Sequence, residues 1–219
     1  MQAKIVKIDK NNPELDVIKH AAEVIGAEGL VVFPTETVYG LGADAFNPKA
    51  VERVFKAKGR SFNNPLTVCI SDAADLNFLV EEIPESAKNI IDKFWPGPLT
   101  LVFKKSDIVS LKITCGRSTV GIRFPDNKIA FSLMALIKIP LILTSANISG
   151  SPSPVEAQQA LNYLGESVDL ILDGGKTALG VESTVLDLTV SPPAIIREGA
   201  IAVKEIEKVL GKPKVADSR

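Results

Sequence analysis

The sequence has one histidine, two cysteines and few aromatic residues. Cys69 and Cys115 form no Cys-x-x-Cys pair, and the histidine is His20. A zinc site needs a cluster of such ligands, so we expect no Cys/His metal centre. Two distant thiols also indicate a reducing compartment without a disulfide framework. Aromatic residues make up 5% of the chain, which argues against an RNA-binding module built on base stacking.

Long apolar runs and an excess of one charge are lacking as well. The most apolar window, residues 129–143, is interrupted by Lys138 and Pro140, whereas a membrane helix needs about 20 apolar residues. The N-terminus shows no apolar stretch typical of a signal peptide. With 25 basic and 26 acidic residues the net charge is −1, which argues against bulk nucleic-acid binding. We therefore expect a cytoplasmic protein with no membrane partner.

One segment does concentrate positive charge. Its basic residues are Lys49, Arg53, Lys56, Lys58 and Arg60. Two interpretations stay open at this stage. The segment is either a solvated helix face, which is the common case for charge runs, or an electrostatic funnel for a polyanion such as ATP.

Apolar runs alternate with helical periodicities along the chain. Strands are predicted at 4–8, 30–33, 66–70, 99–103, 120–124 with a preceding hairpin from 113, 141–144, 169–172, 183–188 and 194–197. Helices are predicted at 13–28, 48–58, 72–78, 84–94, 126–138, 155–164 and 203–210. This alternation predicts an α/β fold with a mixed parallel and antiparallel sheet. We expect one domain over residues 1–210 and a frayed polar tail over 211–219.

The most informative stretch is residues 31–42. Its apolar start reads as a buried strand that Pro34 ends, and Thr35-Glu-Thr-Val-Tyr-Gly-Leu-Gly42 then reads as a polar loop. Open α/β sheets place ligand sites at such strand ends. An ordinary turn after a strand is the alternative.

Phosphate-binding residues have to come from outside a phosphate loop, because no G-x-x-x-x-G-K-[ST] motif is present. Gly175-Lys-Thr177 lacks the earlier glycine and reads as a turn. Lys58 and Arg60 lie just past a predicted helix end and are better candidates. Lys58 could instead complement the negative helix terminus. Ser145 and Asn147 follow a buried strand and can face one ligand, or they can close a turn.

Six short motifs occur in an order found in a known family. They are Pro34-Thr-Glu-Thr-Val-Tyr-Gly-Leu-Gly42, Lys58-Gly-Arg60, Asn64-Pro-Leu66, Ser145-Ala-Asn-Ile-Ser-Gly150, Val181-Glu-Ser-Thr-Val185 and Ile196-Arg-Glu-Gly199. Together they resemble the YrdC family, the threonylcarbamoyl-AMP synthases, over residues 13–204. The resemblance implies a twisted, open, YrdC-like mixed sheet with flanking helices. A second domain found in some relatives is not expected, so the chain resembles the single-domain form.

The resemblance also implies an activity. The enzyme would be a nucleotidyltransferase that converts L-threonine, bicarbonate and ATP to threonylcarbamoyl-adenylate and pyrophosphate. Mg2+ would accompany ATP, held more by the nucleotide and water than by the protein. The product would pass to the tRNA threonylcarbamoyltransferase machinery, which modifies adenosine 37 of tRNA.

Site residues follow from the same resemblance. The catalytic group would be Lys58, Arg60, Ser145 and Asn147. ATP would contact Arg60, Asn64, Thr119, Ser145, Ser153 and Arg197. Threonine would contact Thr37, Cys69, Arg123, the backbone near Leu143, and Ser183. Arg123 suits this role because a guanidinium grips a carboxylate with two parallel hydrogen bonds. A surface ion pair is the alternative for that residue.

The chain departs from the family pattern at two positions. Ser61 follows the Lys-Gly-Arg motif where proline is usual, and Cys69 stands where histidine is usual. The second change bears on the threonine pocket. Two alternative functions therefore stay open: a related protein with a different substrate, and an RNA-binding module, since proteins of this fold have a concave basic surface. RNA is thus a further expected contact.

Overall fold

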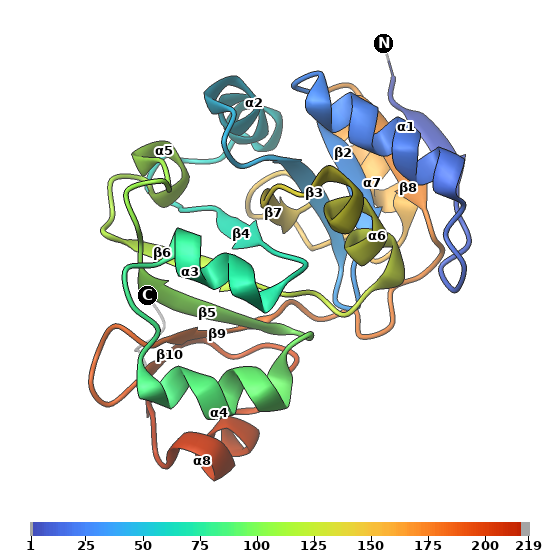
Figure 1. Ribbon diagram of the computed structural model, residues 1–219. Coiled ribbons are helices and arrows are strands. Elements are labelled where there is room, and N and C mark those ends of the chain that lie inside the picture. Colours follow the sequence, from blue (N-terminus) through green and yellow to red (C-terminus); the bar gives the residue numbers. More distant parts are fainter. Residues whose placement is uncertain (1, 216–219) are drawn as a thin grey trace.

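The computed structural model describes residues 2–215 and contains one 11-stranded sheet (Figure 1). The strands are β1 (Lys4–Lys7), β2 (Val31–Pro34), β3 (Tyr39–Asp44), β4 (Thr67–Cys69), β5 (Leu99–Lys104), β6 (Thr119–Arg123), β7 (Leu141–Ser145), β8 (Leu170–Asp173), β9 (Thr184–Asp187), β10 (Ala194–Arg197) and β11 (Lys214–Val215). Their order is β1-β8-β2-β3-β7-β4-β6-β5-β9-β10-β11. The sheet contains both parallel pairs, such as β4–β6, and antiparallel pairs, such as β5–β6, which confirms the predicted mixed α/β sheet.

Helices cover the sheet on both faces. They are α1 (Leu15–Gly26), α2 (Pro48–Lys58), α3 (Leu76–Leu79) after a 3-10 turn η1 (Ala73–Asp75), α4 (Glu85–Phe94), α5 (Leu111–Thr114), α6 (Lys128–Ile137), α7 (Ala157–Leu164) and α8 (Val203–Leu210). In Figure 1, α1 and α6 lie together in front of β2, and they share one apolar core. The buried apolar residues of α2, α4, α7 and α8 belong to a second core. Within residues 2–215, no helix is both long and apolar enough to cross a bilayer.

The boundaries of α2 follow from local chemistry and fix part of the site. The side chain of Asn47 accepts hydrogen bonds from the backbone amides of Lys49 and Ala50, and Pro48 occupies the first turn. Gly59 ends the helix with φ of 56°, a left-handed conformation that favours glycine. The predicted helix at 48–58 is therefore confirmed. Because Gly59 turns the chain, Lys58 and Arg60 leave the helix at a defined place.

The polar loop predicted up to residue 42 was too long. Residues 39–44 form β3, which pairs with β2 in an antiparallel hairpin, so only residues 35–38 form the loop. Glycines in this strand allow close packing: a Cβ placed on Gly40 would lie 2.6 Å from Cδ1 of Leu143. β3 pairs in turn with β7, which brings Gly40 opposite Ser145. The hairpin therefore joins two of the motifs directly.

Three predicted helix and strand boundaries were wrong. The first helix begins at Leu15 rather than at residue 13, because Glu14 precedes it in an extended conformation. Residues 111–114 form α5 instead of a hairpin strand, since the Ser110 side chain accepts a hydrogen bond from Lys112 and caps a helical turn. β6 pairs with β5 instead. Asn127, rather than Asp126, caps α6.

The tail predicted for 211–219 is ordered at its start. Residues 214 and 215 form β11, which pairs in parallel with β10 next to Ala194 and Ile195. This part of the predicted frayed tail was therefore wrong. Residues 216–219 lie outside the described residues.

Candidate active site

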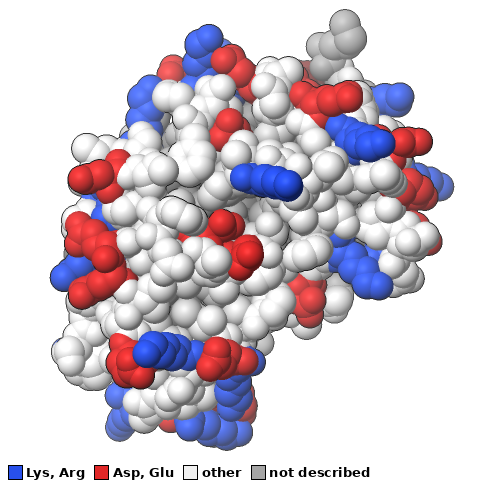
Figure 2. Space-filling model, viewed as in Figure 1, with Lys and Arg blue, Asp and Glu red and all other residues white. Residues whose placement is uncertain are grey.

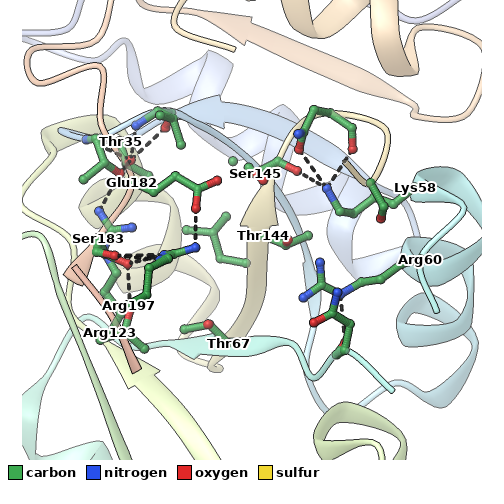
Figure 3. A pocket seen from close by; sticks show the side chains of 18 of the residues that line it. Thr35, Lys58, Arg60, Thr67, Arg123, Thr144, Ser145, Glu182, Ser183 and Arg197 are labelled. Atoms are coloured by element: carbon green, nitrogen blue, oxygen red, sulfur yellow. Dashed lines mark hydrogen bonds and ion pairs between the residues drawn. The ribbon is translucent and has the colours of Figure 1, made fainter. Parts of the chain in front are cut away.

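A polar cavity of about 400 Å³ opens beside the central strands (Figure 3). Its lining combines segments that lie far apart in the sequence. These residues are Thr35, Thr37, Val38, Gly40, Lys58, Arg60, Asn64, Pro65, Thr67, Cys69, Thr100, Arg123, Leu143, Thr144, Ser145, Asn147, Ser149, Gly150, Ser151, Glu182, Ser183 and Arg197. Figure 3 shows Lys58 and Arg60 on one side, and Ser183 and Arg197 on the other.

Strand alternation puts polar groups on the cavity side of the sheet. In β4, Thr67 and Cys69 line the cavity, whereas Val68 packs into the larger core. In β6, Arg123 lines the cavity and Ile122 packs into that core. The register sets Cys69 beside Arg123. Successive side chains of a strand point to opposite faces, so the same strands serve both core and site.

Arg123 is buried at one end of the cavity and is held by two side chains. It is 7% exposed. Its Nη2 donates to Oε1 of Glu36 and to Oγ1 of Thr37, both at 2.8 Å. Nε of Arg123 and Oε2 of Glu36 are buried without a hydrogen-bond partner among the described residues. Buried polar atoms are normally paired, so Arg123 has hydrogen-bonding capacity that the described residues leave unused. Arg123 is thus no surface ion pair.

Glu36 was missed as a site residue in the sequence. It is buried, and its ion pair with Arg123 is also buried. The available signal was a carboxylate directly after a buried apolar strand, where an ionised group requires a partner. The sequence could not show which of the basic residues that partner is.

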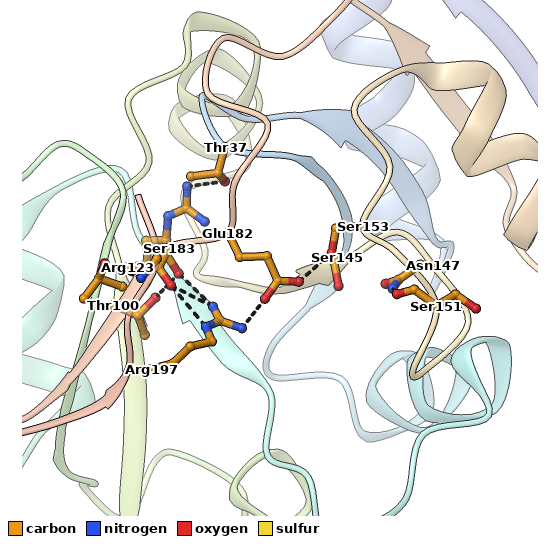
Figure 4. Close-up of polar contacts among 12 residues, drawn as sticks. Thr37, Thr100, Arg123, Ser145, Asn147, Ser151, Ser153, Glu182, Ser183 and Arg197 are labelled. Carbon is orange, nitrogen blue, oxygen red and sulfur yellow. Dashed lines mark hydrogen bonds and ion pairs between the residues drawn. The ribbon is translucent and has the colours of Figure 1, made fainter. Parts of the chain in front are cut away.

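The neighbouring wall consists of hydroxyl groups and a second arginine. Oγ1 of Thr100 and Oγ of Ser183 are 2.9 Å apart. Nε and Nη2 of Arg197 donate to the backbone oxygen of Ser183, at 3.2 and 2.9 Å. Nη1 of Arg197 pairs with Glu182, which also accepts a hydrogen bond from Ser153 (Figure 4). Glu182 and Thr100 were not among the predicted site residues.

Lys58 is buried, contrary to the prediction that it lies open to ligand. It is 1% exposed. Its ammonium donates to the backbone oxygens of Ser145 and Asn147 and to Oδ1 of Asn147, the last two at 2.7 and 3.0 Å. An ammonium has three N–H groups, so all of them are in use. Burial, together with the nearby Arg60, lowers the pKa of Lys58 to about 7. Lys58 therefore fixes the loop after β7.

Arg60 keeps part of its guanidinium free. Its Nε and Nη2 donate to the backbone oxygens of Asn64 and Pro65, both at 2.8 Å. Nη1 makes no hydrogen bond to the described residues and Arg60 lines the cavity. Burial lowers the pKa of Arg60 from its ordinary value. Of the two predicted phosphate residues, Arg60 is the one that can reach a ligand.

The basic segment at 49–60 does not form a continuous funnel. Lys49 pairs with Glu28 at 3.5 Å and Arg53 pairs with Asp169 at 2.9 Å. Figure 2 shows basic and acidic side chains interspersed on the face it presents. The solvated helix face is therefore the better interpretation for the part of the segment before Lys58.

Cys69 lies in the floor of the cavity and is 1% exposed. Its side chain belongs to the core formed by α1 and α6, opposite to Val68 and Ile70. Burial raises the pKa of the thiol to about 12, although the neighbouring Arg123 opposes this rise. The thiol is consequently neutral at physiological pH and offers only weak hydrogen bonds.

The structure brings most of the predicted site residues together. All of them line the cavity except Thr119 and Ser153. Thr119 is the first residue of β6, and Arg123 is the last. Ser153 is connected to the cavity lining by its hydrogen bond to Glu182. The turn predicted at Gly175 is confirmed: its amide donates to Asp173 Oδ1, and the next element along the chain is the strand β9 rather than a helix.

Comparisons with known proteins show to which family the chain is similar. A Sua5/YciO/YrdC family model, described as telomere recombination, matches residues 23–199. The chain is 48% identical to the threonylcarbamoyl-AMP synthase of Pyrococcus abyssi (strain GE5 / Orsay), over 90% of this chain and 58% of the relative. It is 43% identical to the enzyme of that name from Bacillus subtilis (strain 168), over 94% of this chain and 59% of the relative.

A solved structure of similar fold is named as that of P. abyssi Sua5 complexed with L-threonine. It matches with a TM-score of 0.95 and 45% identity, over 98% of this chain and 63% of the other. The chain thus spans less than two thirds of the length of these relatives. The family match covers the described site from Thr35 to Arg197. The chain belongs to the Sua5/YciO/YrdC family.

Proposed function

We propose that this protein forms threonylcarbamoyl-adenylate from L-threonine, bicarbonate and ATP. One observation carries the proposal: a single cavity holds a buried arginine, Arg123, and two more accessible ones, Arg60 and Arg197. A small anion suits the enclosed Arg123, while a larger polyanion suits the other two. The relatives named threonylcarbamoyl-AMP synthase and the relative complexed with L-threonine support this assignment.

The amino acid would bind at the Arg123 end. Nη1 of Arg123 makes no hydrogen bond to the described residues, so it can donate to a carboxylate. The hydroxyls of Thr37 and Ser183, the thiol of Cys69 and the backbone near Leu143 lie around the same end. These groups would orient the threonine amine toward the rest of the cavity.

The nucleotide would bind between Arg60, the loop after β7, and Arg197. Arg60 and Ser145 line the cavity, and Asn64 lies at the Arg60 end. Asn147 is held by Lys58 and by its own hydrogen bond to the backbone of Ser151. Ser153 and Arg197 would add contacts at the mouth, and Thr119 would do so from the start of β6. Lys58 would act by holding this loop rather than by touching phosphate.

The reaction consists of two bond-forming steps. The neutral threonine amine combines with bicarbonate to give a carbamate and water. A carbamate oxygen then attacks the α-phosphorus of ATP, and the bond from that phosphorus to the bridging oxygen breaks to release pyrophosphate. The protein's contribution is to align the two substrates and to neutralise the developing charge, as in other phosphoryl transfers.

Mg2+ would enter with the nucleotide. Residues 2–215 contain no cluster of three His, Cys, Asp or Glu side chains placed to hold a metal ion. Glu182 is the carboxylate that lines the cavity, and it is already paired with Arg197. A Mg2+ bound mainly by phosphates and water fits these residues, and it would neutralise phosphate charge when bound.

The adenylate would be consumed by an enzyme that transfers the threonylcarbamoyl group to adenosine 37 of tRNA. ATP and tRNA occur together in the cytoplasm, so we place the reaction there. A direct RNA contact of this chain would have to involve the mixed-charge surface described above. The balance of charges there favours small-molecule catalysis over an RNA-binding role.

Pyrophosphate release from ATP tests the proposal. We expect release only when threonine and bicarbonate are both present, and little with serine in place of threonine. The reaction product should have the mass of threonylcarbamoyl-adenylate. Equal release without an amino acid would reject the proposal, and release with another amino acid alone would support the alternative of a related enzyme with a different substrate.

A further inference from the structure

Glu182 connects two parts of the cavity mouth. Its carboxylate accepts a hydrogen bond from Oγ of Ser153, in the loop after β7, and pairs with Nη1 of Arg197 in β10. Figure 4 shows the Glu182 side chain lying between these two groups. The loop and the strand are therefore joined across the mouth by one side chain, and no backbone hydrogen bond between Ser153 and β10 is present among the described residues.

The carboxylate of Glu182 accepts a hydrogen bond from the one nitrogen of Arg197 that a ligand could otherwise bind. Nε and Nη2 of Arg197 already donate to the backbone oxygen of Ser183. Nη1 is the remaining nitrogen, and it faces Glu182. A carboxylate offers negatively charged oxygen acceptors, as a phosphate does. In the free protein Glu182 thus occupies both a hydroxyl and a guanidinium that the proposed nucleotide site requires.

This bridge is placed where it can be displaced. The side chains of Arg197 and Glu182 are 45% and 34% exposed. Ion pairs with that much solvent contact contribute a factor of about five or less to an equilibrium. The Arg123–Glu36 pair at the other end of the cavity is about 10% exposed, so the two pairs differ sharply in accessibility.

We infer that Glu182 is a positioning residue that holds Ser153 and Arg197 in place until the nucleotide replaces it. In the free protein it keeps the loop near β10 and neutralises Arg197. When ATP enters, its oxygens take over the hydroxyl of Ser153 and Nη1 of Arg197, and the Glu182 side chain turns to solvent. The inference rests on the proposed function for the identity of the ligand.

ATP binding in the absence of threonine tests this exchange. We expect Glu182→Gln to bind ATP with Mg2+ roughly two- to fivefold more tightly than the native chain in calorimetry, because a weaker competitor has to leave. The affinity for threonine should stay unchanged. Glu182→Asp is the matched control: it keeps the charge, but its side chain is one methylene shorter and cannot touch both partners at once. It should therefore also bind ATP more tightly.

Two results would overturn the inference. Weaker ATP binding by Glu182→Gln would mean that Glu182 itself contacts the nucleotide. If Glu182→Gln binds ATP more tightly but Glu182→Asp binds it like the native chain, the negative charge of residue 182 lowers the affinity for ATP without the bridging contacts. Failure of the proposed function would be seen separately. A native chain that binds ATP but releases no pyrophosphate with threonine and bicarbonate would reject the reaction. The ATP titrations of the Glu182 variants would still decide whether ATP displaces Glu182.

Discussion

The two ends of the cavity each contain an arginine paired with a glutamate, yet they are built differently. Arg123, at the end of the central strand β6, and Glu36 are both buried, and each has a buried side-chain atom without a hydrogen-bond partner among the described residues. Arg197 and Glu182 are partly exposed, and Glu182 is shared with a loop. A buried pair fixes geometry, because breaking it leaves an uncompensated charge in the interior, whereas an exposed pair is easily exchanged. The difference suits a small ligand at the rigid end and a larger one at the open end.

The sharpest way to break this comparison is to remove each arginine in turn. We expect Arg123→Met to lower the free energy of unfolding by about 3–5 kcal/mol, because Glu36 is left buried without its charge partner. Arg197→Met should cost about 1 kcal/mol or less. Denaturant unfolding measures both. The double variant Glu36→Gln/Arg123→Met should recover much of the loss, and equal losses for the two single variants would contradict the contrast.

The role of Arg60 at the open end of the cavity can be tested by the rate of pyrophosphate release. We expect Arg60→Ala to slow pyrophosphate release by about 10²–10³-fold, the typical loss for one donor at a developing charge. The melting temperature should change little, because Arg60 bonds only to backbone oxygens of its own loop. The dissociation constant for threonine should remain near the native value. An unchanged rate would remove Arg60 from the phosphate site, and a collapsed melting temperature would assign it a structural role.

The sequence predicts the fold and the candidate site to different extents. Caps and proline positions predicted α2 correctly, because they act within a few residues. The β2–β3 hairpin was missed because Gly40 and Gly42 read as loop residues, although their lack of side chains lets Leu143 and Phe33 pack there. Lys58 was predicted to be exposed because it lies at the end of a helix. Its burial depends on carbonyl groups some 87 residues later, which no local pattern shows.

Lys58 links the open end to the sheet and should give a pH signature. Its pKa in the folded chain, about 7, lies below the ordinary value of 10.5. Between these two values the unfolded chain binds the proton more strongly, so this group makes stability rise with pH, by at most about 1.4 kcal/mol per pH unit. We expect the unfolding free energy of the native chain to rise between pH 7 and 10 relative to Lys58→Met.

A flat difference between the two chains across that range would contradict the prediction. It would mean that the three acceptors around the ammonium hold its proton despite the burial. Below pH 7 both states carry the proton, so the native chain and Lys58→Met should then differ by a constant amount.

The smallest expected effect concerns Cys69, which lies at the buried end of the cavity. An imidazole is a stronger hydrogen-bonding group than a neutral thiol, and one neutral hydrogen bond contributes about 0.5–1.5 kcal/mol. We expect Cys69→His to tighten threonine binding by about three- to tenfold in calorimetry without changing ATP binding. Cys69→Ala is the control and should change threonine binding little. Loss of activity in a folded Cys69→Ala chain would reveal a role for the thiol.

The sheet order has a consequence for how the protein reaches its folded state. Strands that pair are often far apart along the chain: β2 pairs with β8, which starts at Leu170, and β5 pairs with β9, which starts at Thr184. Closing such long loops before their contacts form is entropically costly, so topologies of this kind fold slowly. While the chain is being synthesised, the edge of β5 stays unpaired until residues 184–187 emerge, and an unpaired edge invites aggregation. The cavity is therefore a late product of folding, and the nascent protein is most vulnerable just before its site is complete.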